Sequence, residues 1–115
     1  MTKTEILIVG RHPQIMETVL RLVNNNGEWN GTMALTDEAA IELFQQRDFE
    51  IVLLCSGIAE ESERKLRSLF TYQEPGIIII QHFGGGSGLL NNEILEALDK
   101  KAKENKPVVF VKDGL

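Results

Sequence analysis

The chain has 115 residues, of which 43% are hydrophobic and 25% are charged, a balance typical of one soluble globular domain. It carries 12 basic and 17 acidic residues, a net charge of −5, and neither sign forms a long block, which argues against a nucleic-acid-binding surface. A single cysteine, Cys55, excludes an internal disulfide, and the apolar runs are too short for a membrane span or a signal peptide. We therefore expect a cytoplasmic protein.

The expected elements alternate between strands and helices. In chain order they are a strand at 6–9, a helix from 13 to about 23, a weaker strand at 29–35, a helix from 37, a strand at 51–55, a charged helix at 60–70, a strand at 77–80, a helix at about 89–104 and a strand at 108–111. Most of the strands are apolar at every position, which is typical of strands buried on both faces of a parallel sheet. Helices are indicated by apolar spacings of three and four, by Pro13 in a first turn, and by Thr36 as an N-cap with Asp37 and Glu38 behind it. The alternation predicts one α/β domain, residues 1–115, with a parallel five-stranded sheet, right-handed crossovers and helices on both faces.

Any ligand site should lie at the carboxyl ends of the strands, because ligands of parallel α/β sheets bind there. The glycine-rich stretch after the fourth strand adds backbone N–H groups beside a helix N-terminus, an arrangement that suits an anion. The stretch matches neither the P-loop nor the dinucleotide fingerprint, so a mobile loop is the alternative interpretation. The candidate pocket residues are Gly10, Arg11, His12, Ser56, Gln81, His82, Gly84, Gly85, Gly86 and Lys112, and the loop extends to Gly88.

Cys55 ends the third predicted strand. Together with His12 and His82 it offers zinc-binding side chains, but the sequence has no close-spaced pair of ligands. A redox-sensing thiolate stabilised by Arg11 lacks a resolving cysteine. A buried free cysteine that packs as a small hydrophobic residue is the simplest interpretation, and we expect neither a metal nor a cofactor.

Three segments resemble receiver domains of two-component response regulators, in the order and spacing of that family. Residues 6–13, Ile-Leu-Ile-Val-Gly-Arg-His-Pro, resemble the strand-one motif, in which an acidic pair precedes His-Pro. Residues 36–40, Thr-Asp-Glu-Ala-Ala, resemble the start of the second helix, and residues 49–55 resemble the approach to the phosphoacceptor aspartate. The resemblance covers residues 4–112 and implies a flavodoxin-like sheet with the strand order 2-1-3-4-5.

The resemblance also implies a reaction whose groups are largely replaced in this chain. The family uses an acidic pair to hold a divalent cation, an aspartate to accept the phosphoryl group, a Ser or Thr, and a lysine. Gly10 and Arg11 stand at the acidic pair, Cys55 at the phosphoacceptor and Gln81 at the Ser/Thr, whereas Lys112 matches the lysine. An arginine repels magnesium, which prefers carboxylate and water oxygens. The resemblance therefore predicts the fold, but in a degenerate, or pseudo-, receiver.

We accordingly expect a phosphorylation-independent signalling or protein-interaction module that is not an enzyme and that binds a protein partner or a second copy of itself. The alternative is an anion- or nucleotide-responsive switch that uses Arg11, Lys112 and the loop at 84–88. A flavodoxin-like enzyme is disfavoured, because the strand ends hold no acid–base pair.

Only three residues follow Lys112, too few for the fifth helix that a complete receiver has beside its first helix. The apolar residues at 77–80 and 108–111 imply cover on both faces of the sheet, which the first helix alone cannot supply. We expect the uncovered face either to form a symmetric homodimer or to be covered by a longer native chain. The alternative is that the fifth strand lies at the edge of the sheet, where a rearranged last helix or loop covers enough of it.

Overall fold

The computed structural model describes residues 3–84 and 86–104, in which strands and helices alternate along the chain. The strands are β1 (Thr4–Val9), β2 (Trp29–Ala34), β3 (Ile51–Cys55) and β4 (Ile78–His82); the helices are α1 (Pro13–Asn24), α2 (Asp37–Gln46), α3 (Glu60–Gln73) and α4 (Gly86–Glu104). The strand expected at 108–111 and Lys112 lie outside the described residues. Every other expected element is present, with α4 beginning three residues before the predicted start at Leu89.

The described strands form one parallel sheet in the order β2-β1-β3-β4, as predicted for the first four strands. Ile6 pairs with Ile51, and Ile51 pairs in turn with Ile78, so the apolar runs lie side by side across the sheet. The central strand β3 is buried along its whole length. Burial on both faces explains why its sequence is apolar at every position.

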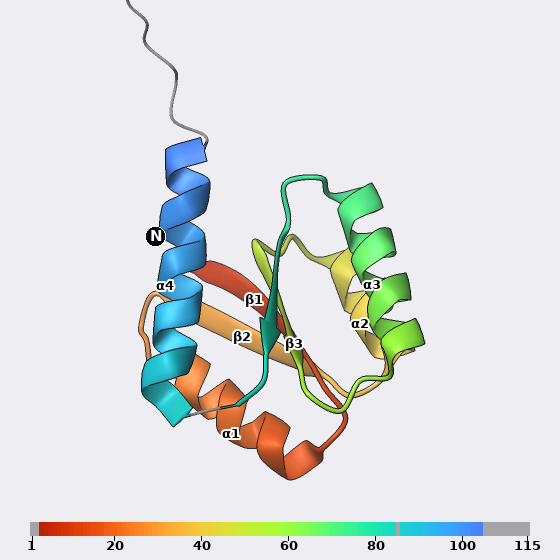
Figure 1. Cartoon of the computed structure of the whole chain (residues 1–115), viewed down its shortest axis with the longest axis horizontal. Coiled ribbons are helices and arrows are strands. Elements are labelled where there is room, and N and C mark those ends of the chain that lie inside the picture. Colours follow the sequence, from red (N-terminus) through yellow and green to blue (C-terminus); the bar gives the residue numbers. More distant parts are fainter. Residues whose placement is uncertain (1–2, 85, 105–115) are drawn as a thin grey trace, which may run out of the picture.

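Each face of the sheet carries two helices and its own hydrophobic core (Figure 1). Successive side chains of a strand point to opposite faces, so Ile8 packs in one core and Leu7 in the other. The first core, here the α1–α4 core, contains buried residues of α1 and α4. The second, the α2–α3 core, contains those of α2 and α3, where the rings of Phe44 and Phe70 lie 4.3 Å apart. This layering confirms the predicted α/β architecture.

Local signals set the starts of the first two helices. Pro13 opens α1, where its fixed φ suits the first turn and its missing N–H costs no helical hydrogen bond. Thr36 caps α2, because its hydroxyl oxygen accepts a hydrogen bond from the backbone N–H of Ala39 at 3.1 Å. Both starts confirm the prediction.

α4 lies beside α1 on the same face of the sheet, and the expectation that this face is left uncovered is therefore wrong (Figure 1). Leu90 and Ile94 are buried in the core that α1 also covers, and Leu98 packs against that core. Apolar spacing predicts that this segment is a helix, but it does not tell on which face of the sheet the helix packs. The last described helix thus covers this face, and a dimer through that face loses its basis. The fifth strand of the alternative interpretation lies outside the described residues.

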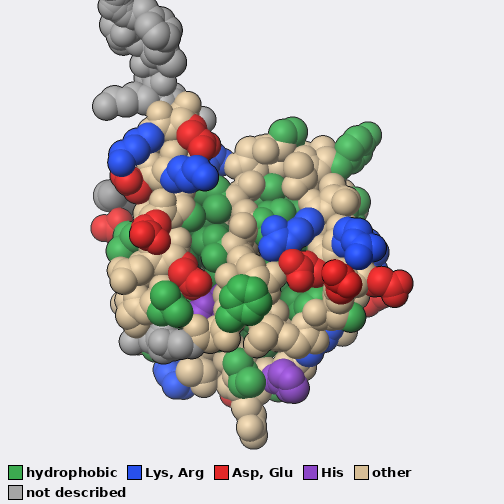
Figure 2. Space-filling model, in the orientation of Figure 1, with side chains coloured by type: hydrophobic (Ala, Val, Ile, Leu, Met, Phe, Trp, Pro, Cys, Tyr) green, Lys and Arg blue, Asp and Glu red, His purple; other side chains and the backbone are tan. Residues whose placement is uncertain are grey.

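β4 is an edge strand of the described sheet, and the isoleucines at 77–80 are only half-buried. Ile77 and Ile79 pack against the α2–α3 core, whereas Ile78 and Ile80 pack against the α1–α4 core. A groove of about 400 Å³ runs between β4 and α4. Figure 2 shows hydrophobic side chains at the surface beside α4. The cover expected on both faces of this strand is incomplete in the described part of the chain.

Candidate functional site

The candidate residues at the carboxyl ends of the strands lie in two separate parts of the structure. Arg11 interacts with the start of α2, whereas Cys55, Ser56, His82 and Gly84 line a cavity beside α1. Arg11 and the glycine-rich stretch therefore do not line one cavity in the described structure.

Arg11 lies at the end of β1 and forms an ion pair with Asp37, the first residue of α2. Its Nη2 lies 2.5 Å from Asp37 Oδ1, and its Nη1 donates to the carbonyl of Leu35 at 3.2 Å. Lys65 of α3 contacts the same carboxylate, with its Nζ 2.9 Å from Oδ2. One carboxylate therefore lies between two cations and joins β1, α2 and α3. We call these three residues the Arg11–Asp37–Lys65 cluster.

Asp37 is the only buried carboxylate among residues 3–84 and 86–104, with 8% of its surface exposed. Burial acts to raise its pKa, but hydrogen bonds from Lys65, Arg11 and Ser62 outweigh burial and lower the pKa to about 2. The carboxylate is therefore ionised near neutral pH, and the cluster carries excess positive charge. The sequence places Asp37 in the first turn of a helix, but no spacing rule indicates that a lysine of a later helix reaches it.

A cavity of about 240 Å³ lies beside α1 at the carboxyl ends of β3 and β4. Cys55 and His82 pair across these neighbouring strands, and both are buried. The Nδ1 atom of His82 lies 2.7 Å from Oε1 of Glu93 in α4, and this contact orients the ring. The full lining is Ile15, Thr18, Val19, Leu22, Cys55, Ser56, His82 and Gly84. Aliphatic side chains of α1 form much of the wall, so the cavity suits a small apolar molecule with one polar group better than a phosphate.

Burial, and then the negative charge of Glu93, raise the pKa of the Cys55 thiol to about 11. The thiol is therefore neutral near pH 7, and a neutral thiol is a poor nucleophile and a poor metal ligand. Arg11, which the redox-sensing alternative requires beside the thiolate, is bound to Asp37 instead. Cys55 packs in the α1–α4 core, as the simplest interpretation predicts.

We expect the native Cys55 thiol to react slowly with an aromatic disulfide reagent. Because the pKa is raised from 9.0 to about 11, the thiolate fraction near neutral pH falls by about 100-fold. Labelling rates followed by absorbance should therefore be at least about 100-fold lower in native buffer than in denaturing urea. Similar rates in the two solutions would contradict a buried, neutral thiol.

Two other candidates have structural contacts. Gln81 donates to the carbonyl of Leu54 at 3.2 Å and lies 3.4 Å from a guanidinium nitrogen of Arg67 in α3. Gly10 is buried, and a Cβ atom at this position would clash with the sulfur of Met16. The glycine therefore permits the close approach of α1 to the end of β1.

The glycine-rich stretch is partly helical, because α4 begins at Gly86 and contains Gly88. Gly84 has a φ of 104°, a left-handed conformation that glycine adopts without strain. Gly85 lies outside the described residues. His12, also a candidate, is exposed. The loop is thus shorter than the predicted 84–88.

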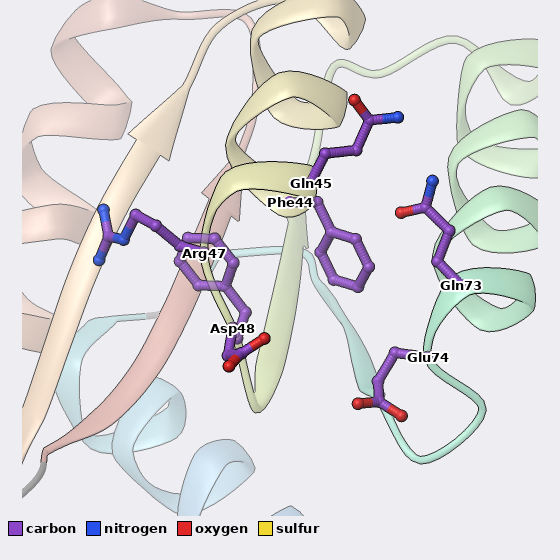
Figure 3. Close-up of a pocket in the computed structure, with 7 residues that line it drawn as sticks. Phe44, Gln45, Arg47, Asp48, Gln73 and Glu74 are labelled. Atoms are coloured by element: carbon purple, nitrogen blue, oxygen red, sulfur yellow. The ribbon is translucent and has the colours of Figure 1, made fainter.

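A further cavity, of about 290 Å³, lies at the opposite end of the sheet, where α2 and α3 end (Figure 3). Its arginine, Arg47, already has partners: its Nη2 lies 2.6 Å from Glu5 Oε1, and its guanidinium lies 5.0 Å from the ring centroid of Phe49. The rings of Phe44 and Phe49 belong to the α2–α3 core. Because its cation is engaged and its rings are structural, we assign this cavity no function.

Across residues 3–84 and 86–104, no three His, Cys, Asp or Glu side chains are placed to hold a metal ion. No helix in the same part of the chain combines the length and the apolar character needed to cross a membrane.

Several solved structures share this fold. The signal receiver domain of an HD domain-containing protein from Pseudomonas fluorescens Pf-5 matches with a TM-score of 0.73 and 15% identity, over 88% of this chain and 98% of that chain. A CheY-like response regulator receiver domain protein from Methanospirillum hungatei JF-1 matches with a TM-score of 0.68 and 17% identity, over 90% of this chain and 100% of that chain. A Burkholderia pseudomallei K96243 protein described as related to pilus assembly matches with a TM-score of 0.58 and 16% identity, over 88% of this chain and 87% of that chain.

No family model and no curated protein matches the sequence. The likeness to solved structures shows that the chain has a receiver-like fold, as the sequence resemblance implies.

Proposed function

We propose that the chain is a protein-interaction module of signal transduction that works without phosphorylation. Its receiver-like fold supports a signalling role, and we propose that it acts in the cytoplasm as a non-enzymatic partner of another protein. The receiver reaction needs carboxylates where the first and third strands end. In this chain Gly10 and Arg11 follow β1, and Cys55 ends β3.

The guanidinium of Arg11 is the observation that carries this proposal. A divalent cation at the end of β1 would be repelled by Arg11 and Lys65, and the adjacent carboxylate of Asp37 is already paired with both. Arg11 supplies a fixed positive charge near the place where the family holds its metal ion. The ion pairs through Asp37 also hold α2 and α3 in one arrangement, which is consistent with a module that presents a constant surface.

We expect acetyl phosphate with magnesium to leave the chain unmodified, and beryllofluoride with magnesium to leave its melting temperature unchanged. The physical reason is that Gly10 and Arg11 stand where the family has its metal-binding acidic pair, and the neutral thiol of Cys55 does not replace the acceptor. Intact-mass spectrometry measures the first result and thermal denaturation measures the second. A receiver domain that retains its acidic pair and phosphoacceptor aspartate is the positive control. A stable adduct with the mass of one phosphoryl group would overturn the proposed function.

The second candidate is a ligand-responsive switch, and the cavity at Cys55 and His82 favours it. Both residues are buried, and the contact with Glu93 fixes the ring of His82. Arg11 does not line this cavity, so the observations support an apolar ligand with one hydrogen-bonding group rather than the anion first expected. Such a ligand would connect α1, β3 and β4.

Ligand-induced shifts of the melting temperature separate the two candidates, because a molecule that binds only the native state stabilises it by mass action. Inorganic phosphate and a nucleoside triphosphate test the anion version, and a set of small aromatic alcohols tests the apolar version. A shift with the alcohols that is lost in a Val19→Phe variant, which fills the cavity, would support a switch. The absence of any shift would leave the interaction module as the better explanation.

A further inference from the structure

The direction of the crossovers restricts what can pair with the outer edge of β4. In the order β2-β1-β3-β4, the connection from β1 to β2 moves across the sheet toward β2, and its helix α1 packs on the face of the α1–α4 core. The connection from β3 to β4 moves across the sheet in the opposite direction, and its helix α3 packs on the other face. Reversing both the direction and the face preserves the hand, so the two connections have the same hand, as parallel crossovers nearly always do.

α4 breaks this pattern, because it leaves β4 and packs on the face of α1. A parallel strand of the same chain placed outside β4 would then complete a crossover of the opposite hand. Such connections make up only about 2% of parallel crossovers. The hand of the crossover therefore disfavours pairing between the strand predicted at 108–111 and β4 of the same chain.

The outer edge of β4 is nevertheless well suited to receive a strand. No described strand pairs with it, and half-buried isoleucines flank it on both faces of the sheet. The groove of about 400 Å³ beside it is bounded on the helix side by Ala97, Lys100, Lys101 and Glu104 of α4. An exposed strand edge with apolar flanks is a template for pairing with another chain.

Residues 105–115 follow α4 and contain the apolar, β-forming run Val-Val-Phe-Val at 108–111. We propose that this run of one copy pairs with the outer edge of β4 in a second copy, so that a five-stranded sheet is completed between molecules. The rule on crossover hand applies within one chain, and exchange of the strand between copies avoids it. The exchange is reciprocal, so a symmetric dimer contains this strand pairing twice. This interface differs from the face beside α1, which α4 already covers.

Photo-crosslinking in a mixed sample tests the exchange. The full chain with Phe110→benzoylphenylalanine is mixed with an equal amount of uniformly ¹⁵N-labelled wild-type chain, equilibrated and irradiated. We expect cross-links from position 110 of the light chain to heavy peptides that contain residues 77–80. Links found only within one light copy would overturn exchange in favour of an opposite-handed crossover. The absence of any link to residues 77–80 would overturn docking at β4.

The oligomeric state gives a second, independent readout. In light scattering coupled to size exclusion, the wild-type chain should be a dimer at high micromolar concentration, and Val109→Asp should shift it to a monomer. Leu95→Asp is the matched control, because Leu95 is 51% exposed on α4 and outside the groove, and it should stay dimeric. A monomeric wild-type chain would overturn this inference and would leave the phosphorylation-independent function untouched.

Discussion

Replacing Ile94 by alanine should lower the free energy of unfolding by about 2–5 kcal/mol. Ile94 is fully buried where α4 packs beside α1, and alanine there loses apolar contacts and leaves a cavity. Urea denaturation measures the loss, with the fluorescence of Trp29 as the signal. Trp29 is the only tryptophan of the chain and belongs to the same core, so it reports on that core directly.

Leu95→Ala is the matched control for this prediction. Leu95 is the next residue on the same helix but is 51% exposed, so its truncation should change stability by no more than about 0.5 kcal/mol. If Ile94→Ala costs as little as Leu95→Ala, α4 does not pack on the face of α1. That result would also remove the topological reason for strand exchange, because a helix on the other face permits a right-handed crossover to a fifth strand.

Much of the fold follows from local features of the sequence. The continuous apolar runs indicate buried parallel strands, and Pro13 and Thr36 mark helix starts. The position of α4 does not follow from such features, because its apolar row at Leu90 and Ile94 would suit either face of the sheet. Only the three-dimensional packing against α1 decides between the faces.

The candidate site was predictable to a similar extent. Topology brings the residues that follow parallel strands to one edge of the sheet, so the general position of Arg11, Cys55 and His82 could be expected. Their partners Asp37 and Glu93 belong to separate helices, and no sequence spacing connects them. Side-chain direction also alternates along a strand, so neighbouring candidates such as Gln81 and His82 belong to opposite faces. Whether the candidate residues line one pocket therefore depends on contacts that the sequence does not reveal.

The Arg11–Asp37–Lys65 cluster has a structural role, because it joins the end of β1 to the two helices that cover one face of the sheet. Here both cations are engaged with a buried carboxylate, so the contacts that hold α2 against α3 do not depend on a bound ion.

Replacing Asp37 by asparagine should remove the negative charge that lies between Arg11 and Lys65. The free energy of unfolding at pH 7 should then fall by about 2 kcal/mol. The folded chain lowers the pKa of this carboxyl from 3.8 to about 2, chiefly through hydrogen bonds from Lys65 and Arg11 that outweigh burial. Asparagine keeps the size of the side chain but not its charge, and it leaves two cations close together. Glu38→Gln is the matched control, because Glu38 is exposed in the same helical turn and has no partner of this kind among the described ion pairs.

The dependence on pH distinguishes lost ion pairs from a general packing defect. Because the folded state has the lower pKa, the unfolded state takes up the proton first as the pH falls below about 4, and the stabilisation by Asp37 is lost between about pH 4 and pH 2. Above pH 4 that stabilisation is fully present in the wild-type chain. Urea denaturation at a series of pH values should therefore show the wild-type and Glu38→Gln chains losing stability toward pH 2, while Asp37→Asn loses about 2 kcal/mol less over the same range. Parallel curves for wild-type and Asp37→Asn chains would mean that Arg11 and Lys65 do not hold this carboxylate in its ionised form, and the fixed charge at the end of β1 would have to be explained in another way.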